Sequence, residues 1–520
     1  RMQGSRGISF RMSASRRSWF VALVLLAFAA VCLTHLDADV YMDPDSTEYI
    51  LLARSIATGT GYRDVSQPDW PRNNLKPPGL PVLLAPTAIL FPYSVIAAKV
   101  TIVFMAIGML VAFWQLANRV LRPASALFVF GILASSPATF WFARDVLSEL
   151  PYTACTLVLV TLELNRSAHD DKSHRHFLGF ESPLSLVLWV ALMAFIPFIR
   201  AVGLAFTIAM MFPVSNEWKW QTGLATAAGG WWKRVLLVLA TVIPFAVWSI
   251  ACASRQGELP YSWWFALERF SAVWEWTRTS FGFYVDSVAD YGLGRVPIYF
   301  SILLVVLPVL GMIATRGSGG FTILPYFVIY LIVVSVYPCR HPRLVWPLVP
   351  FALIWGARGL ESLVTTWLEP TCKTLFLKPI LLSLGTLWFA AQVFVCASWM
   401  DITQRFGAGP QRWGDLPWHA WGDWQAAAEW LKGNTPEHTR VLTRNKSLGL
   451  WSNRLQQHVL FERMSASELE DAIRTTRAQY LVLGYWGAGA LMPVERMNRN
   501  PVYSFEQMVD FQGVRIYRVT

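Results

Sequence analysis

Apolar runs long enough to cross a bilayer recur along most of the chain, and they restrict what it can fold into. A helix needs about 20 mainly apolar residues to span the hydrocarbon core. Only 15% of the 520 residues are charged, whereas soluble proteins carry about 25%. We therefore expect an α-helical polytopic membrane protein with about 11 transmembrane helices. The predicted spans are Ser18–Leu36, Val95–Ala117, Ala124–Ala138, Pro151–Leu164, Ser185–Pro213 (counted as two because Pro197 and Arg200 break it), Val235–Ala253, Val296–Ala314, Phe321–Tyr337, Leu344–Trp355 and Leu375–Ala397.

Lysine and arginine gather in the loops on one side of these spans. This bias accounts for the net charge of +11 through the positive-inside rule and gives no reason to expect nucleic-acid binding. The basic N-terminal flank is then cytoplasmic, and the first apolar run is either an uncleaved span or a signal peptide. Residues 37–94 form a first outer loop, in which Gly79–Pro92 is too short to cross and lies on the membrane. The prediction is a multi-pass protein of the plasma (inner) membrane.

The composition changes near residue 398. Segment 1–397 is the predicted transmembrane domain, and 398–520 is a small soluble α/β domain outside the membrane. Trp421–Lys432 has helical periodicity, and 465–477 is a capped helix. Short strand-like runs occur at 440–444, 458–461, 480–483 and 514–519.

Polar residues that could do chemistry are concentrated in one stretch of the first outer loop, residues 43–81. It holds Asp43, Asp45, Glu48 and Tyr49, and Lys76 follows before two prolines. Ionisable groups beside a membrane span are expensive to keep, so they indicate a functional site.

Asp45 at the mouth of a span could act as a general base toward an acceptor hydroxyl that attacks a sugar carbon. Because no partner acid is evident, the leaving group must be a good one, such as a lipid phosphate held by cations. Arginine suits bidentate phosphate contact. Four basic residues lie on the predicted outer face: Lys76, Arg200, Arg340 and Arg343.

Each of these residues also has a structural interpretation. Asp45 could cap the helix that starts near Ser46, and Asp43 could carry the chemistry instead. Arg340 and Arg343 could be interfacial anchors. Arg200, between two prolines, is harder to explain without a partner.

Two acids in the second outer loop, Asp145 and Glu149, are four residues apart and share a face if the segment is helical. They could bind an acceptor or a cation, or pair with Arg144. The six cysteines are scattered, with no zinc or redox spacing.

Four segments resemble the GT-C superfamily of membrane glycosyltransferases, in particular bacterial members related to protein mannosyltransferases and to the aminoarabinose transferase of lipid A. They are PDSTEYILLARSIATGTGY, KPPGLP, RDVLSELPY and CRHPRLVWPLVPFALIWGARGL. The soluble tail is similar to C-terminal domains of many bacterial members.

The resemblance implies an inverting transferase that uses a polyprenyl-phosphate sugar. It implies that Asp45 is the catalytic carboxylate, that Lys76 contacts the donor phosphate and that Asp145 or Glu149 is the second-loop acid. Many relatives have adjacent Asp and Glu where this chain has Asp43-Pro44-Asp45, so the base is Asp45 or Asp43. The predicted substrate-binding residues are Lys76, Tyr49, Asp145, Glu149, Arg200, Arg340 and Arg343. Divalent metal use varies in the superfamily, and a divalent cation is left open.

Three classes of function follow. The first is a glycosyltransferase whose partners are a polyprenyl-phosphate sugar donor, the lipid bilayer and a lipid, glycan or protein acceptor. The second is a transporter or flippase of a lipid-linked substrate, for which site residues near mid-membrane and repeated halves would be expected. The third is a non-catalytic scaffold whose tail binds cell-wall partners.

Overall fold

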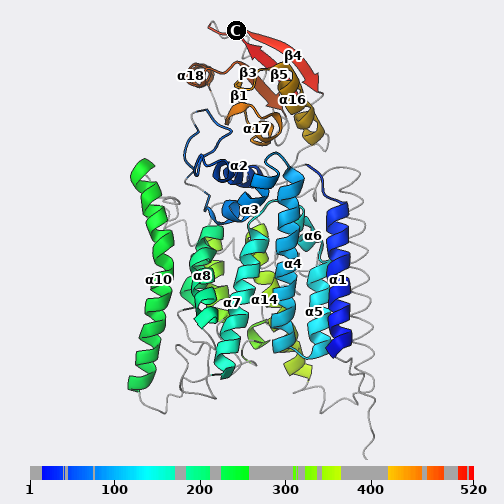
Figure 1. The fold of residues 1–520 in the computed structure, drawn as a ribbon, viewed down its shortest axis with the longest axis vertical. Helices are drawn as coiled ribbons and strands as arrows, with labels where there is room; N and C mark the ends of the chain where they lie inside the picture. Colours follow the sequence, from blue (N-terminus) through cyan, green and yellow to red (C-terminus); the bar gives the residue numbers. More distant parts are fainter. Residues whose placement is uncertain are drawn as a thin grey trace, which may run out of the picture.

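Upright helices form the lower part of the molecule, and a small sheet with its own helices lies above them (Figure 1). The structure is a computed structural model. It describes residues 14–38, 40, 45–68, 70–73, 76–169, 183–210, 224–256, 308–311, 313, 323–336, 342–364, 420–458, 465–484, 502–511 and 514–520.

The upright helices coincide with the apolar runs. They are α1 (Ala14–Thr34), α4 (Val95–Val120), α5 (Pro123–Ser135), α7 (Glu149–His169), α8 (Pro183–Ile199), α10 (Leu224–Gln256), α13 (Ile323–Val336) and α14 (Val349–Leu363). Their core is apolar, and α4 starts where Ser94 accepts a hydrogen bond from the Ala97 amide.

By length and apolarity, two helices of the described chain can each cross a membrane alone, Ser15–Thr34 and Val95–Val120. A third span results if α5 and α6 (Pro137–Ala143), bent by 54°, count as one. The total of about 11 spans therefore stays a prediction. Most of Val296–Ala314 and all of Leu375–Ala397 lie outside the described residues.

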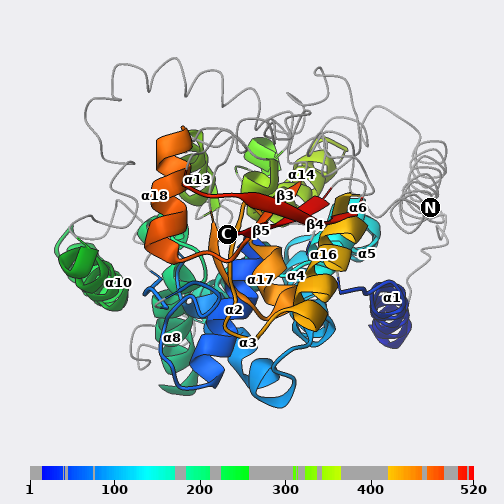
Figure 2. The same cartoon turned by 90° about the horizontal axis from the view of Figure 1, so that it is seen from above.

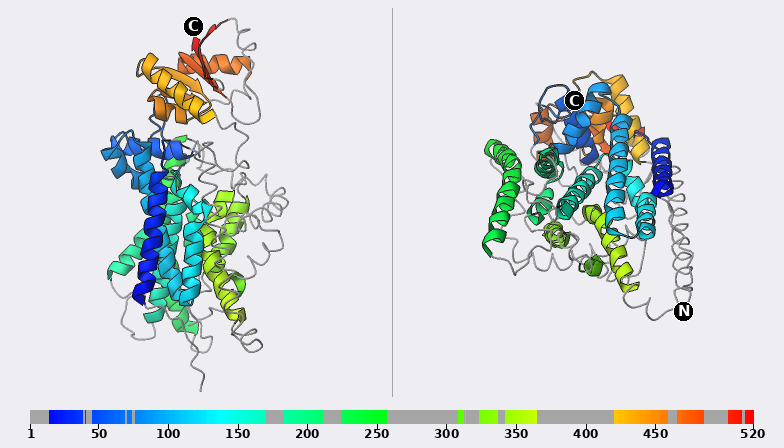
Figure 3. Two further views of the ribbon diagram at one scale, coloured as in Figure 1. Left: turned by 90° about the vertical axis from the view of Figure 1, so that its right-hand side faces the viewer. Right: turned by 60° about the horizontal axis from the view of Figure 1, so that its bottom comes forward.

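Two short helices, α2 (Asp45–Ala57) and α3 (Gly79–Leu90), form a thin layer between the upright helices and the sheet (Figure 3). The 12-residue α3 is too short to cross a membrane, as expected. It packs directly on the end of α8, because a Cβ at Gly79 would lie 2.5 Å from the Phe198 carbonyl carbon.

Two breaks near the upper ends of the helices hold side chains of the site. Helix α8 ends at Ile199, and Arg200 occupies the break before α9 (Gly203–Ala209). The 3₁₀ helix η5 (Pro342–Leu348) precedes α14 and carries Arg343. The predicted interruption at Arg200 is thus confirmed.

The C-terminal region is a mixed five-stranded sheet in the order β2-β1-β3-β5-β4. Strand β1 is parallel to β2 and β3, and β5 is antiparallel to β3 and β4. The strands are β1 (Arg440–Thr443), β2 (Leu455–His458), β3 (Tyr480–Gly484), β4 (Phe505–Phe511) and β5 (Val514–Val519), and the helices are α16 (Ala420–Asn434), α17 (Ser447–Ser452) and α18 (Ala466–Thr476).

Helices α16 and α18 cover opposite faces of the sheet, each with its own apolar cluster (Figure 2). The predicted helices occur, as do the strand-like runs at 440–444, 480–483 and 514–519. The run at 458–461 is tested only at His458, the last residue of β2 (Leu455–His458), because 459–461 lie outside the described residues. Neither β4 nor α17 was predicted. The proposed domain boundary at 398 also falls outside the described residues.

Candidate active site

Asp45 begins α2, and its carboxylate accepts from two cations that come from distant parts of the chain. Lys76 Nζ contacts Oδ1 and Arg343 Nη2 contacts Oδ2. Burial alone would raise the pKa of Asp45, but Arg343 and Lys76 outweigh it and hold that pKa well below its usual range. The carboxylate is therefore ionised and held in place from both sides.

Glu48 lies one helical turn after Asp45 and also has two cationic partners. Lys76 Nζ is 3.7 Å from Oε2, and Lys446 Nζ contacts Oε1. Lys446 immediately precedes α17, which lies over α2 in Figure 2. Beside this pair, the buried hydroxyls of Thr47 and Ser447 are 3.0 Å apart. The C-terminal region thus contributes a cation directly to the first loop.

Glu149 begins α7, and Arg343 links it to Asp45. Arg200 Nη1 lies 2.6 Å from Glu149 Oε1, and Arg343 Nε lies 3.8 Å from the same oxygen. The second oxygen of this buried carboxylate, Oε2, accepts no hydrogen bond within the described part of the chain. One arginine therefore holds acids from two loops that are far apart in sequence.

Tyr49 and Ser148 contact each other and the cations that pair with Asp45 and Glu149. The Tyr49 hydroxyl donates to Ser148 Oγ at 3.4 Å, and Arg200 Nη1 donates to the same oxygen at 3.3 Å. Burial raises the pKa of Tyr49, so its hydroxyl stays a neutral donor. Lys76 Nζ lies 5.6 Å from the centre of the tyrosine ring, within cation–π range.

Counted over the described residues, this ion-pair cluster has three carboxylates and four cations, a net formal charge of +1. Its members are Asp45, Glu48, Glu149, Lys76, Arg200, Arg343 and Lys446. Arginine and lysine side chains that face one another in a half-buried site favour an additional anion.

The remaining predicted residues divide into two groups. Asp145 is fully buried and accepts a hydrogen bond from the Val146 amide, next to it in sequence, so it caps its own turn. Arg144 pairs with Asp37 at 3.2 Å, and the pairing partner of Glu149 is Arg200. Asp43 and Arg340 lie outside the described residues.

Lys446 was missed by the sequence reasoning. It lies in the C-terminal segment, 398 positions after Glu48, in a run with no strand or helix signal. Only the packing of α17 on α2 reveals its role.

Metal binding is not supported by the donors that are described. No group of three or more His, Cys, Asp or Glu side chains suited to a metal ion occurs among the described residues. The carboxylates of the cluster contact lysine and arginine instead.

The fold, with its upright apolar helices, crosswise first loop and C-terminal sheet, matches that of solved GT-C glycosyltransferases. The resemblance seen in the sequence is confirmed at the level of the fold. No family model matches the chain, and no curated protein matches it.

Two solved structures give the comparison in detail. The chain is similar to ArnT from Cupriavidus metallidurans bound to undecaprenyl phosphate, with 14% identity, 97% of this chain and 98% of that one covered, and a TM-score of 0.59. It is also similar to the archaeal oligosaccharyltransferase AglB from Archaeoglobus fulgidus, in complex with an inhibitory peptide and a dolichol-phosphate. The two chains are 12% identical, the match covers 90% of this chain and 70% of AglB, and the TM-score is 0.56.

Proposed function

We propose that the chain is a glycosyltransferase that moves a sugar, with inversion, from a polyprenyl-phosphate donor to a lipid, glycan or protein acceptor. The observation that carries the proposal is the position of Asp45 between Lys76 and Arg343, with Glu149 attached through the same arginine. This arrangement brings a carboxylate base next to cations that suit a phosphate leaving group. The structures named above contain undecaprenyl phosphate and a dolichol-phosphate, and their fold is the one found here.

In the reaction, Asp45 accepts the proton of an acceptor hydroxyl while that oxygen bonds to the anomeric carbon. The bond from this carbon to the phosphate oxygen breaks, and its electron pair leaves with polyprenyl phosphate. Attack from the face opposite the phosphate inverts the anomeric configuration. Lys76 and Arg343 stabilise the charge that develops on the leaving phosphate.

The low pKa of Asp45 requires an explanation, because a strongly paired carboxylate is a weak base. Donor binding supplies one. A phosphate competes for Lys76 and Arg343, so the carboxylate loses part of its pairing and its pKa moves back up. In this scheme the base becomes effective only when the donor is bound.

The other predicted residues are assigned to binding the substrates. Arg200 holds Glu149, whose second oxygen is able to accept from the acceptor, and Tyr49 donates within the same space. Asp43 remains the second candidate for the base, and Asp145 and Arg340 remain candidate substrate contacts. We place the cluster and the C-terminal region, residues 398–520, on the extracytoplasmic side of the plasma membrane, above about 11 spans, on the strength of the basic loops.

The test uses the full-length protein in nanodiscs. Mass spectrometry of a co-purified lipid identifies the donor, which is then supplied with a radiolabelled sugar. Asp45→Asn should lose about 10²–10⁴-fold of the transfer rate, the contribution of a general base. Donor binding should stay equal or become tighter, because a competing carboxylate is gone. Asp43→Asn is the matched variant, and Arg474→Met, on an arginine with 71% side-chain exposure in α18, is the control.

Full transfer by Asp45→Asn would remove Asp45 as the base, and loss in Asp43→Asn alone would move the role there. Labelled sugar that crosses closed vesicles without a covalent product would instead identify a transporter.

A further inference from the structure

Arg54 is a buried cation outside the ion-pair cluster. It lies on α2 with 8% of its surface exposed, and among the described residues its guanidinium has no carboxylate partner and donates no hydrogen bond. The ring of Tyr93 lies 5.3 Å from the guanidinium carbon. An uncompensated buried charge is costly, and burial lowers the pKa of Arg54 to about 10.

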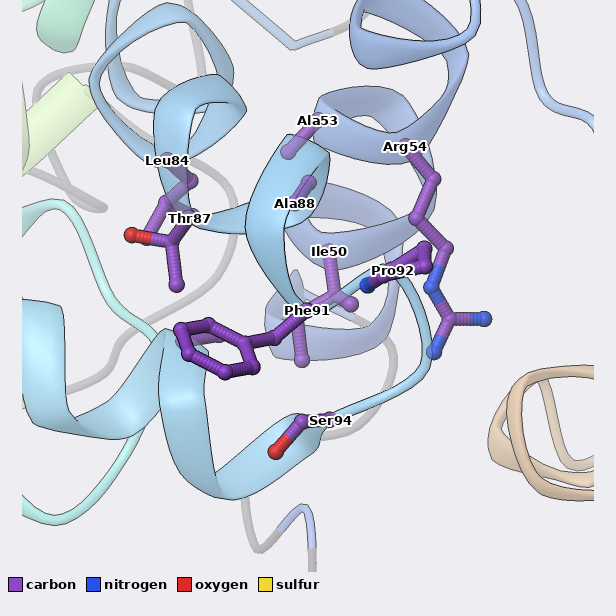
Figure 4. Close-up of a pocket in the computed structure, with 10 residues that line it drawn as sticks. Ile50, Ala53, Arg54, Leu84, Thr87, Ala88, Phe91, Pro92 and Ser94 are labelled. Carbon is purple, nitrogen blue, oxygen red and sulfur yellow. The ribbon is translucent and has the colours of Figure 1, made fainter.

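Arg54 lines a cavity of about 320 Å³ between the first loop and the C-terminal region. Figure 4 shows a second, smaller pocket that Arg54 also lines, with the Arg54 side chain leaving α2 beside Pro92 and on the side away from Leu84. Trp70, Tyr93 and His438 also line the cavity. Its volume is at the small end of ligand pockets and equals that of about ten waters in the liquid, which suits a single sugar ring.

The charges around this cavity favour an anion. Arg454, also 8% exposed, donates only to neutral oxygens, the carbonyls of Lys432, Ser452, Asn453 and Thr435 and the hydroxyl of Thr435. The one carboxylate in the lining, Glu437, is exposed and accepts from the Asn453 amide. The lining therefore includes two buried arginines without carboxylate partners among the described residues and one exposed acid. Because Arg454 already donates through all three of its nitrogens, Arg54 is the arginine with donors left for an anion.

The cavity is separate from the candidate active site. Arg54 lies nine residues after Asp45 on the same helix, about 14 Å along its axis at 1.5 Å per residue. An anion there cannot be the phosphate that Lys76 and Arg343 hold.

We propose that the Arg54 cavity binds a sugar-sized group that carries a phosphate or a carboxylate. The planar guanidinium provides bidentate recognition of either anion, and Trp70 and Tyr93 provide apolar walls. On the proposed function, on which this assignment rests, the group is a part of the acceptor remote from the reacting hydroxyl.

The experiment measures binding without donor, so that it does not depend on transfer. Full-length protein in zwitterionic nanodiscs is titrated with glucose 6-phosphate, glucuronate, glucose or inorganic phosphate, by calorimetry and by the shift in Tm. A phosphorylated glycolipid placed in the disc distinguishes a membrane-borne source from a soluble one. The variants are Arg54→Met and Arg54→Lys, with Arg474→Met as the exposed control and Arg343→Met as the control for the ion-pair cluster.

We expect both anionic sugars to bind and glucose to bind at least tenfold more weakly. Arg54→Met should lose at least tenfold in affinity for the anions, with a Tm no lower than the parent because an unpaired buried charge is removed. Arg54→Lys should keep part of the affinity and Arg474→Met all of it, whereas Arg343→Met should keep the portion of anion binding that Arg54→Met loses.

Equal binding of glucose and glucose 6-phosphate would overturn the proposal. So would anion binding that survives in Arg54→Met and is lost in Arg343→Met. A lowered Tm in both Arg54 variants with unchanged anion affinity would assign a structural role. Asp45→Asn should keep the portion of anion binding that depends on Arg54, so failure of the transfer reaction leaves this result intact.

Discussion

Replacing Arg343 tests the central connection of the ion-pair cluster. Removing one partner of a buried ion pair typically costs about 3–5 kcal/mol. Arg343 has 18% of its side chain exposed, and Asp45 and Glu149 keep Lys76 and Arg200 as second partners. We therefore expect Arg343→Met to lose about 2 kcal/mol, equivalent to a fall in Tm of about 2 °C in a chain of this size.

Arg343→Lys is the matched variant. The guanidinium contacts Asp45 through Nη2 and Glu149 through Nε. A lysine ammonium retains the charge but cannot contact both carboxylates simultaneously. We expect about half of the loss seen with methionine. Thermal unfolding of the full chain in one detergent measures both variants.

The pH dependence provides an independent measurement. In the parent, the pKa of Asp45 is depressed, so the stability that its ionised form contributes is present above the ordinary carboxyl pKa and is lost only as the pH falls through the depressed value. Arg343→Met removes one of the two cations, so the pKa moves back up. The acid limb of kcat/KM and the acid loss of stability should both move to higher pH. Unchanged Tm and unchanged acid limbs in Arg343→Met would refute the reasoning.

Two further predictions concern the ends of the first loop. Glu48→Gln and Lys446→Met, measured singly and together, should show a coupling of about 1–2 kcal/mol in the free energy of unfolding. The pair is largely buried, but Glu48 keeps Lys76 as a second partner. Additive effects would mean that the contact contributes nothing. Gly79→Ala should lower the Tm and slow transfer, since its Cβ would come within 2.6 Å of backbone atoms at the end of α8, whereas Gly108→Ala, with open space around its Cβ, should leave both unchanged.

Much of the site could be predicted because local pattern and membrane topology are both visible in the sequence. Asp45, Tyr49 and Lys76 belong to one loop, and Arg200 was distinguished by its position between prolines in an apolar run. Arg343 lies 298 positions after Asp45. It was identified only because positive-inside counting places both on one side of the bilayer.

The parts that sequence reasoning missed lack such a signal. Strand β4 has mostly exposed side chains and, among the described strands, pairs only with β5, so the inward–outward alternation that marks a strand is weak. Asp145 is predicted to contact substrate, and its Oδ1 accepts a hydrogen bond from the Val146 amide, so the substrate contact stays a prediction. A cap and a ligand contact have the same sequence signature, and only the direction of the side chain separates them.

The contact between α17 and α2 bears on what the C-terminal region does. Besides the Lys446 pair, the Gln456 amide donates to the Ser66 carbonyl at 2.6 Å, and Trp451 Nε1 donates to the Ala38 carbonyl at 3.3 Å. These bonds fix the first loop from above while Lys76 and Arg343 hold Asp45 within it. Without the C-terminal region, Glu48 would compete with Asp45 for Lys76, since its other cation would be absent. The region is therefore part of the electrostatics of the site, and a partner-binding tail alone would not need a lysine at this position.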